Sequence, residues 1–130
     1  MSRRFVVTGD PIAVVTQALP GIIARVPDLA GFEFGTQIPA GVTPKRFIRV
    51  GLVGEVEYEA TGLTEADIRV QVWAEGDELR QSVSRQLMAH LRARLRAQVV
   101  TGPVNLPDPV DTATLLTQFV VSILVKGSQQ

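Results

Sequence analysis

Three acidic side chains, Glu75, Asp77 and Glu78, surround Gly76 where a predicted strand turns into a predicted helix. Phosphate binding at such a corner needs a glycine-rich turn or a Gly-Lys-Ser/Thr ending, and nucleophilic chemistry needs a serine at the elbow. This corner has none of these, and three carboxylates would repel a phosphate. We therefore expect a structural joint in which Asp77 is the N-cap of the helix.

His90 is the only histidine, and the chain contains no cysteine. A metal site around one histidine would need several carboxylates, and no H-E-x-x-H spacing is present. His90 lies at the edge of the apolar stripe of its helix, which favours a packing edge or a subunit contact over catalysis. We expect no catalytic residue, no metal and no cofactor, and so a protein that is not an enzyme.

Three arginines, Arg85, Arg92 and Arg96, project from nearly one side of the same predicted helix. Such a row could contact nucleic acid. However, 13 basic residues balance 13 acidic ones, and only 5% of residues are aromatic. Zero net charge gives no general attraction to nucleic acid or to an anionic membrane. Two interpretations remain, a solvated helix face and salt bridges to a neighbouring subunit.

The only tryptophan, Trp73, shares the polar face of its predicted strand with Arg69 and Gln71. A tryptophan in this position is either an anchor that a partner buries or a part of ordinary core packing. The sequence leaves both interpretations open.

An acidic run, Glu55, Glu57 and Glu59, alternates with less polar residues. If it continues the preceding strand, it forms an acidic ribbon edge that could pair with a basic patch on a neighbouring copy. The alternative is a mobile charged loop. In either case the segment 54–65 is longer than a tight turn needs, and we expect an exposed connection or a long hairpin tip.

Periodicity and turn residues predict the order of the elements. We expect a helix over 11–26, strands over 32–38, 45–53 and 66–74, a helix over 77–95, an extended connection over 101–111 and a strand over 113–127. Pro20-Gly21 either kinks or splits the first helix. The fold class is α+β, with a single mixed or antiparallel sheet of about four strands and two helices packed on one face. One domain spans residues 1–130.

Two apolar stripes and one alternating strand define the expected core. The stripes are Ile12, Val15, Leu19, Ile22 and Val26 in the first helix, and Leu79, Val83, Leu87, Leu91 and Leu95 in the second, with Met88 at its edge. The strand contributes Ile68, Val70, Val72 and Ala74. The N-terminal apolar run is too short for a signal peptide, and no stretch approaches the roughly 18 to 20 apolar residues of a membrane span. We expect a soluble protein.

Several stretches in this order resemble the small tail terminator proteins of long-tailed bacteriophages (siphophages), particularly those of actinobacterial phages. The resemblance begins with an early helix and covers most of the chain. It rests on "FIRVGLVGE" (47–55), "DIRVQVWAEGDELRQSVSRQLMAHLRARL" (67–95), "GPVNLPDPVD" (102–111) and a terminal strand ending in "LVKG".

The resemblance implies a fold similar to the lambda-type terminator and a hexameric ring of identical subunits. The ring would cap the head-proximal end of the tail tube, stop the addition of tail tube protein, and dock the head-completion or connector protein, with DNA passing through its lumen. The protein would be found in the virion tail and neck, and in the host cytoplasm during assembly. The connections 54–65 and 101–111, the latter with Asp108 and Asp111, are the expected inter-subunit and axial contacts.

Other functions are compatible with the same sequence. A head-to-tail stopper or adaptor of the phage neck is similar in size. A small RNA- or ligand-binding module would use the exposed sheet face, with Arg49, Arg69 and Trp73 as its readers. An enzyme centred on His90 is the weakest alternative.

Overall fold

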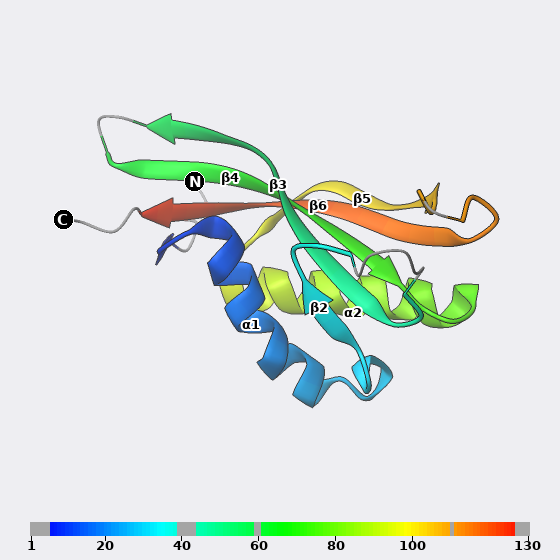
Figure 1. The fold of residues 1–130 in the computed structure, drawn as a ribbon. Helices are drawn as coiled ribbons and strands as arrows, with labels where there is room; N and C mark the ends of the chain where they lie inside the picture. The colour runs from blue at the N-terminus through cyan, green and yellow to red at the C-terminus, as the bar shows by residue number, and fades with distance from the viewer. Residues whose placement is uncertain (1–5, 39–43, 59–60, 110, 127–130) are drawn as a thin grey trace.

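The computed structural model describes residues 6–38, 44–58, 61–109 and 111–126. Within these ranges, two helices lie on one face of a mixed sheet, and no helix covers the other face (Figure 1). The elements are β1 (Val6–Thr8), α1 (Pro11–Arg25), the 3-10 helix η1 (Pro27–Leu29), β2 (Glu33–Gly35), β3 (Phe47–Tyr58), β4 (Leu63–Trp73), α2 (Asp77–Leu95), β5 (Gln98–Pro107) and β6 (Leu115–Lys126). The expected α+β fold is confirmed.

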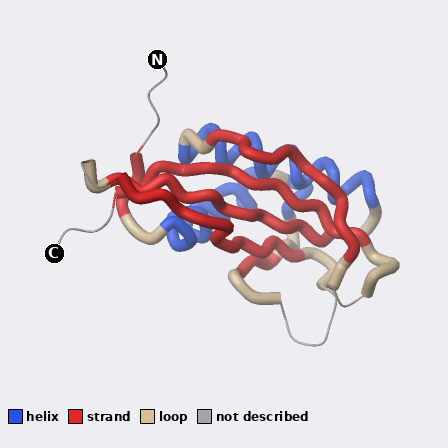
Figure 2. The backbone as a smooth tube through the Cα atoms, turned by 90° about the horizontal axis from the view of Figure 1, so that it is seen from above, coloured by secondary structure: helices blue, strands red, loops and turns tan. Residues whose placement is uncertain are grey.

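The sheet has the strand order β1-β6-β4-β3-β2, and β5 pairs with β6. The pairs β3–β4, β4–β6 and β5–β6 are antiparallel, whereas β1 and β2 pair in parallel with their neighbours. Viewed onto the helix-free face, the strands run side by side with both helices behind them (Figure 2). The sheet thus has six strands where about four were expected.

The extra long strand is β5, which the prolines of 101–111 had led us to expect as a connection. That expectation was wrong, because β5 pairs only with β6 and is therefore an edge strand within the described part of the chain. Proline is tolerated there, since an outward-facing position needs no N–H donor. Register shifts between Val99 and Thr101 and between Thr101 and Val104 accommodate Gly102 and Pro103.

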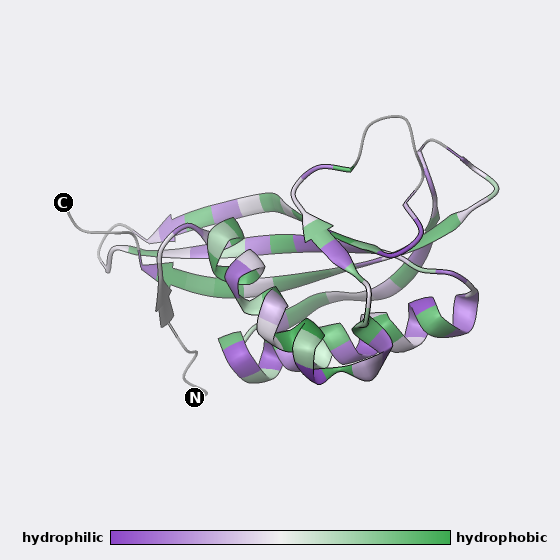
Figure 3. Ribbon diagram, turned by 60° about the horizontal axis from the view of Figure 1, so that its bottom comes forward, coloured by the Kyte–Doolittle hydropathy of each residue, from purple (hydrophilic) through white to green (hydrophobic). Residues whose placement is uncertain are grey.

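The core lies between the sheet and the helices. Ile68, Val70 and Val72 of β4 are fully buried, as the alternation predicted, and they pack with the apolar residues of α1 and α2. Polar and apolar residues alternate along the strands (Figure 3). Alternation along a strand places one set on each face, so the helix-free face receives most of the polar set, apart from a small apolar cluster of Phe47, Trp73 and Leu116 at one end.

Helix α1 begins as the sequence predicted. Asp10 is the N-cap, and its Oδ1 accepts a hydrogen bond from the backbone N–H of Ile12 at 3.3 Å. The helix is continuous to Arg25 with Pro20 inside it. Pro20 is exposed, so its ring points away from the core. Gly21 faces α2, where an added Cβ would lie only 2.6 Å from Nη1 of Arg94.

Helix α2 covers the expected residues, but its N-cap lies one residue earlier than expected. The N-cap is Gly76, with φ 81°, and not Asp77. A positive φ of this kind favours glycine, so Asp77 becomes the first helical residue and pairs with Arg80 at 2.8 Å. Val83, Leu87, Leu91 and Leu95 are buried as predicted, but so are Arg80 and Ser84. The left-handed C-cap is Arg96, with φ 52°.

Candidate assembly surfaces

The β3–β4 hairpin, with β6 paired beside β4, extends beyond the helices (Figure 1). Its strands are residues 52–58 of β3 and 63–67 of β4, which we call the hairpin arm. Tyr58 closes the turn, because its carbonyl accepts hydrogen bonds from the N–H groups of Thr61 and Gly62 at 3.0 Å each. Of the two interpretations of 54–65, the long hairpin holds over the described residues; Glu59 and residue 60 lie outside them.

The β3 strand of the arm is exposed along residues 52–58. Glu55 pairs with Ala66, which belongs to the helix-side core, so Glu55 and Glu57 lie on the helix side of the arm. Val56 and Tyr58, which alternate with them, lie on the opposite side and are 55% and 46% exposed. Glu65 and Asp67 of β4 pair with Val56 and Gly54 and lie on that same side, so both faces of the arm combine acidic and apolar side chains.

The outer edge of β3 has no neighbouring strand beyond residue 49 in the described part of the chain. The short strand β2 pairs only with residues 47–49. The remaining β3 residues pair with β4 on their other side. Leu52 and Val53, at a register shift in this edge, are 41% and 55% exposed. An unpaired strand edge with exposed apolar side chains is a site where another chain can bind.

A basic surface lies at the end of α2. Arg92 and Arg96 are exposed, Arg85 is exposed about two turns before Arg92, and Arg94 is half-buried against Gly21. The chain then enters β5, where Val99, Val100 and Val104 are 37%, 54% and 42% exposed. We call Arg92, Arg96, Val99 and Val100 the basic edge.

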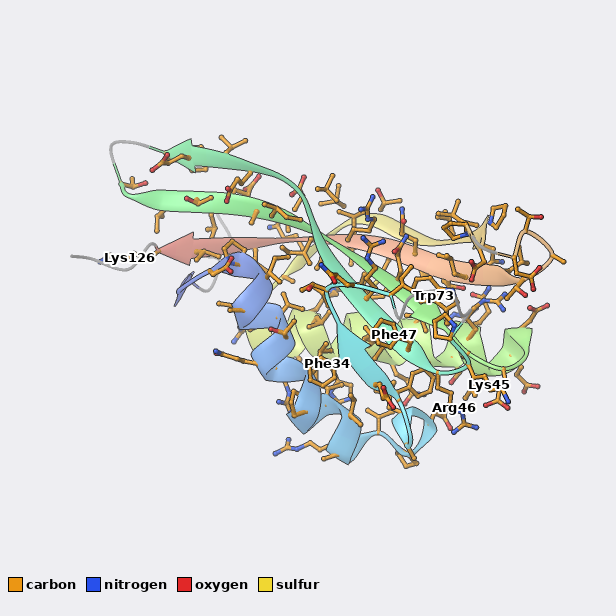
Figure 4. All side chains as sticks on the ribbon, viewed as in Figure 1. Phe34, Lys45, Arg46, Phe47, Trp73 and Lys126 are labelled. Carbon is orange, nitrogen blue, oxygen red and sulfur yellow. The ribbon has the colours of Figure 1, made fainter. Side chains whose placement is uncertain are left out.

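The arm and the basic edge lie toward the same end of the sheet but on opposite edges. Gly54, Asp67, Ser122 and Gln98 form one row across β3, β4, β6 and β5. The arm begins near this row and continues past it, whereas β5 begins at it. We call this the open end of the molecule; Lys126 marks it in Figure 4.

Trp73 marks the opposite end of the sheet (Figure 4). It is 1% exposed and forms a small second core with Phe47 and Leu116, against which Ile38 and Leu106 pack. Its ring centroid lies 6.2 Å from that of Phe47. Its Nε1–H donates to Oδ2 of Asp108 at 2.8 Å. Of the two interpretations of Trp73, core packing holds.

Asp108 is also removed from the set of expected surface contacts. It is 2% exposed, and its carboxylate accepts the hydrogen bond from the buried indole of Trp73. Arg80 is equally buried at this end, and its Nε–H donates to Oγ1 of Thr117 at 2.9 Å. We call this the closed end, since its polar groups bond to one another inside the chain.

Arg49 and Arg69 lie on the helix-free face, as expected. The guanidinium of Arg49 donates to the carbonyl of Thr36 at 3.2 Å and to Gln71 at 3.3 Å. Gln71 in turn donates to Gln118 at 3.0 Å. Arg69 lies over Gly51, 3.8 Å from where a Cβ would stand. These contacts link neighbouring strands, and the guanidinium of Arg49 is already hydrogen-bonded within the chain.

Asp111 is exposed and stabilises the turn before β6. Its carboxylate accepts from Oγ1 of Thr114 at 2.8 Å and from the N–H of Ala113 at 3.2 Å. His90 is half-buried on α2, and among the described residues no hydrogen bond from its ring to another side chain is found.

The acidic corner borders an open hollow of about 500 Å³. Asp28, Glu75, Asp77 and Glu78 line it with Gly76, Leu79 and Ser82. Asp28 accepts from Ser82 and Gln86, and Glu75 pairs with Arg46 at 2.9 Å. Over the described residues, no group of three or more metal-binding side chains is arranged around a common point. The corner positions the start of α2.

Comparison with known protein families gives no match, and comparison with curated proteins gives no relative. Across the described ranges, none of the helices has the length and apolar character needed to cross a membrane. The exposed surfaces therefore provide the grounds for a functional proposal.

The apolar residues of these surfaces were not predicted as contact sites. Val53 and Leu52 were assigned to a strand, and Val99 and Val100 received no role. One signal was available: "QVV" (98–100) is a β-branched run directly after a helix and before a Gly-Pro pair, which is typical of an edge strand.

Proposed function

We propose that this chain is a structural assembly protein of the tail-terminator class. Copies of it form a ring on the head-proximal end of a siphophage tail tube, prevent further addition of tube protein, and provide the joint to the head connector. One face of the ring matches the last tube ring, and the other lacks the surface that recruits a further tube subunit. Growth of the tube therefore ends by geometry.

The hairpin arm is the observation that favours this proposal most. Seven consecutive residues of β3, 52–58, are exposed, and four of them are large and apolar. Apolar surface gains free energy when it is removed from water, by roughly 25 cal/mol per Å². In an isolated subunit these four side chains remain 41–55% exposed, so their burial in an assembly would add to this gain.

A ring also needs two different contact surfaces on each subunit, because head-to-tail contacts are what close into rings. The arm and the basic edge meet this requirement, since they differ in charge and lie on opposite sheet edges. The order of the elements also supports the proposal, because the resemblance to tail terminators described above rests on it. The RNA-binding alternative has lost its aromatic reader, because Trp73 is buried.

The test is a capping assay with the tail tube protein encoded beside this chain. Tube protein is allowed to polymerise with and without the chain, and tube lengths are measured by negative-stain microscopy. We expect shorter tubes with a ring at one end. Tubes of unchanged length without an end ring would contradict the terminator function; binding only to a connector ring would instead indicate a stopper or adaptor.

A further inference from the structure

The zero net charge of the chain conceals a separation of charge along it. Residues 50–68 contain five acidic residues (Glu55, Glu57, Glu59, Glu65 and Asp67) and no lysine or arginine. Residues 79–107 contain five arginines (Arg80, Arg85, Arg92, Arg94 and Arg96) and no acidic residue. The first segment includes the hairpin arm, and the second includes the basic edge.

The exposed members of both sets have no ion-pair partner within the described part of the chain. Glu55 and Glu57 form no ion pair with any described residue, and neither do Arg92 and Arg96. By contrast, Arg80 is buried and paired with Asp77. Exposed charges of opposite sign on two surfaces of one molecule favour contact between copies and steer their approach.

The same two surfaces expose the large apolar residues and the unpaired strand edges. Leu52, Val53, Val56 and Tyr58 lie on the arm, and Val99, Val100 and Val104 lie on β5. Interface centres combine apolar contacts with charged groups at the rim. Two bulges and Pro103 interrupt β5, so side-chain contacts, more than an extended backbone ladder, would join the surfaces.

We infer that the hairpin arm of one copy docks on the basic edge of the next copy, so that subunits associate head to tail. Leu52 and Val53 of the arm contact Val99 and Val100, and Glu55 and Glu57, which lie on the same side of the arm as Leu52, face Arg92 and Arg96. An arm-to-arm contact would bring the acidic residues together and is disfavoured. This inference names the partner surface of the ring and rests on the proposed function for the ring's role.

Cysteine cross-linking tests the direction of association, because the natural chain has no cysteine. Val56→Cys and Val100→Cys are combined in one chain and treated with a short bis-maleimide at increasing protein concentration. We expect a ladder from dimer upward that ends at the ring size. Val56→Cys alone should give no product, since only arm-to-arm contacts would join two of these residues.

The matched control combines Val56→Cys with Gln17→Cys, an exposed residue of α1 outside both surfaces. It should give no ladder. A dimer from Val56→Cys alone, or only monomers from the Val56/Val100 chain at every concentration, would overturn the inference.

Charge reversal provides an independent test. One variant has Glu55→Lys and Glu57→Lys, and the other has Arg92→Glu and Arg96→Glu. Each alone should associate at least about tenfold more weakly than the natural chain, because like charges then meet at every contact. An equimolar mixture should associate again, since each arm finds an oppositely charged edge on the other variant. Alternation closes only in rings with an even number of subunits, such as the expected hexamer.

Light scattering over a concentration series, at about 50 mM and about 500 mM salt, measures these masses. Association should weaken at the higher salt, where exposed charges are screened within about 4 Å. Natural protein that stays monomeric, single variants that associate normally, or a mixture that stays monomeric would each overturn the inference. If the charge variants still cap tubes, the inferred contact is wrong and the terminator function stands. If the ladder forms but tubes are never capped, the contact stands and the terminator function is wrong.

Discussion

Polar groups at the two ends of the sheet lie in opposite environments, buried at one end and exposed at the other. At the closed end, Trp73 and Asp108 bond to each other in a site that solvent does not reach, and Arg80 donates to Thr117 nearby. At the open end, Glu57 and Arg96 point into solvent without an ion-pair partner among the described residues. Both ends belong to the same strands and the same helix.

This difference separates stability from assembly. Buried polar groups must be bonded inside the chain, because an unsatisfied one costs about 1–3 kcal/mol. Exposed charges contribute little to folding, usually under about 1 kcal/mol, and are free to bind a partner. Substitutions at the closed end should therefore lower the free energy of unfolding, and substitutions at the open end should change association.

The largest expected contrast is between the two aromatic residues at opposite ends of the β3–β4 hairpin. Trp73→Ala should lower the free energy of unfolding by about 3–5 kcal/mol, since it removes a buried ring and leaves Asp108 without its indole donor. Tyr58→Ala on the arm should lower it by less than about 0.5 kcal/mol. Urea unfolding followed by circular dichroism measures both. Equal losses at the two positions would show that the arm is part of the folding core.

A second contrast uses two arginines of α2. Arg80→Ala should cost about 2–3 kcal/mol, because the side chain is buried and donates charged hydrogen bonds to Thr117 and Asp77. Arg85→Ala, one turn further along and exposed, should cost under about 0.5 kcal/mol. The same unfolding experiment compares them, and a loss at Arg85 as large as at Arg80 would argue against this division of roles.

Local patterns in the sequence predicted most of the fold. The four-residue spacing of α2 and the alternation of β4 place residues on faces without knowledge of any partner strand, so these faces were predicted. Helix α2 covers the expected residues, but its N-cap is Gly76 and not Asp77, because Gly76 adopts a positive φ, which no spacing encodes. Strand β5 was missed because Pro103 and Pro107 indicate a loop unless the strand is known to lie at an edge.

The candidate surfaces could be predicted only in part, since their definition depends on contacts distant in sequence. The acidic ribbon at Glu55 and Glu57 was one of two interpretations that the alternation left open. The burial of Trp73 was not predicted, because its hydrogen-bond partner Asp108 is 35 residues away in the sequence. The pairing of Leu63 with Lys126 likewise makes the arm's inner strand part of the sheet, so deleting 54–65 would damage the fold, and point substitutions test the arm better.

A smaller contrast compares two threonines of neighbouring strands. Thr117→Val should cost about 1–2 kcal/mol, because the buried Arg80 Nε–H loses its acceptor while the side-chain shape is kept. Thr64→Val on the arm should change stability by less than about 0.5 kcal/mol, since valine suits a strand and no buried donor depends on the hydroxyl. Thermal unfolding detects the difference. If both variants match the natural chain, the closed end does not depend on this hydrogen bond.

The smallest expected effect is a gain at the open end. Arg96 is held at φ 52°, a conformation that costs a non-glycine residue about 1 kcal/mol and is usual for glycine at the end of a helix. Arg96→Gly should therefore raise the free energy of unfolding of the monomer by up to about 1 kcal/mol. It should at the same time weaken association, because it removes one cation of the basic edge. Arg92→Ala, which lies inside the helix, should weaken association without the gain in stability. A variant that becomes both more stable and more strongly associated would show that Arg96 opposes assembly, and would move the contact with the arm to another part of α2.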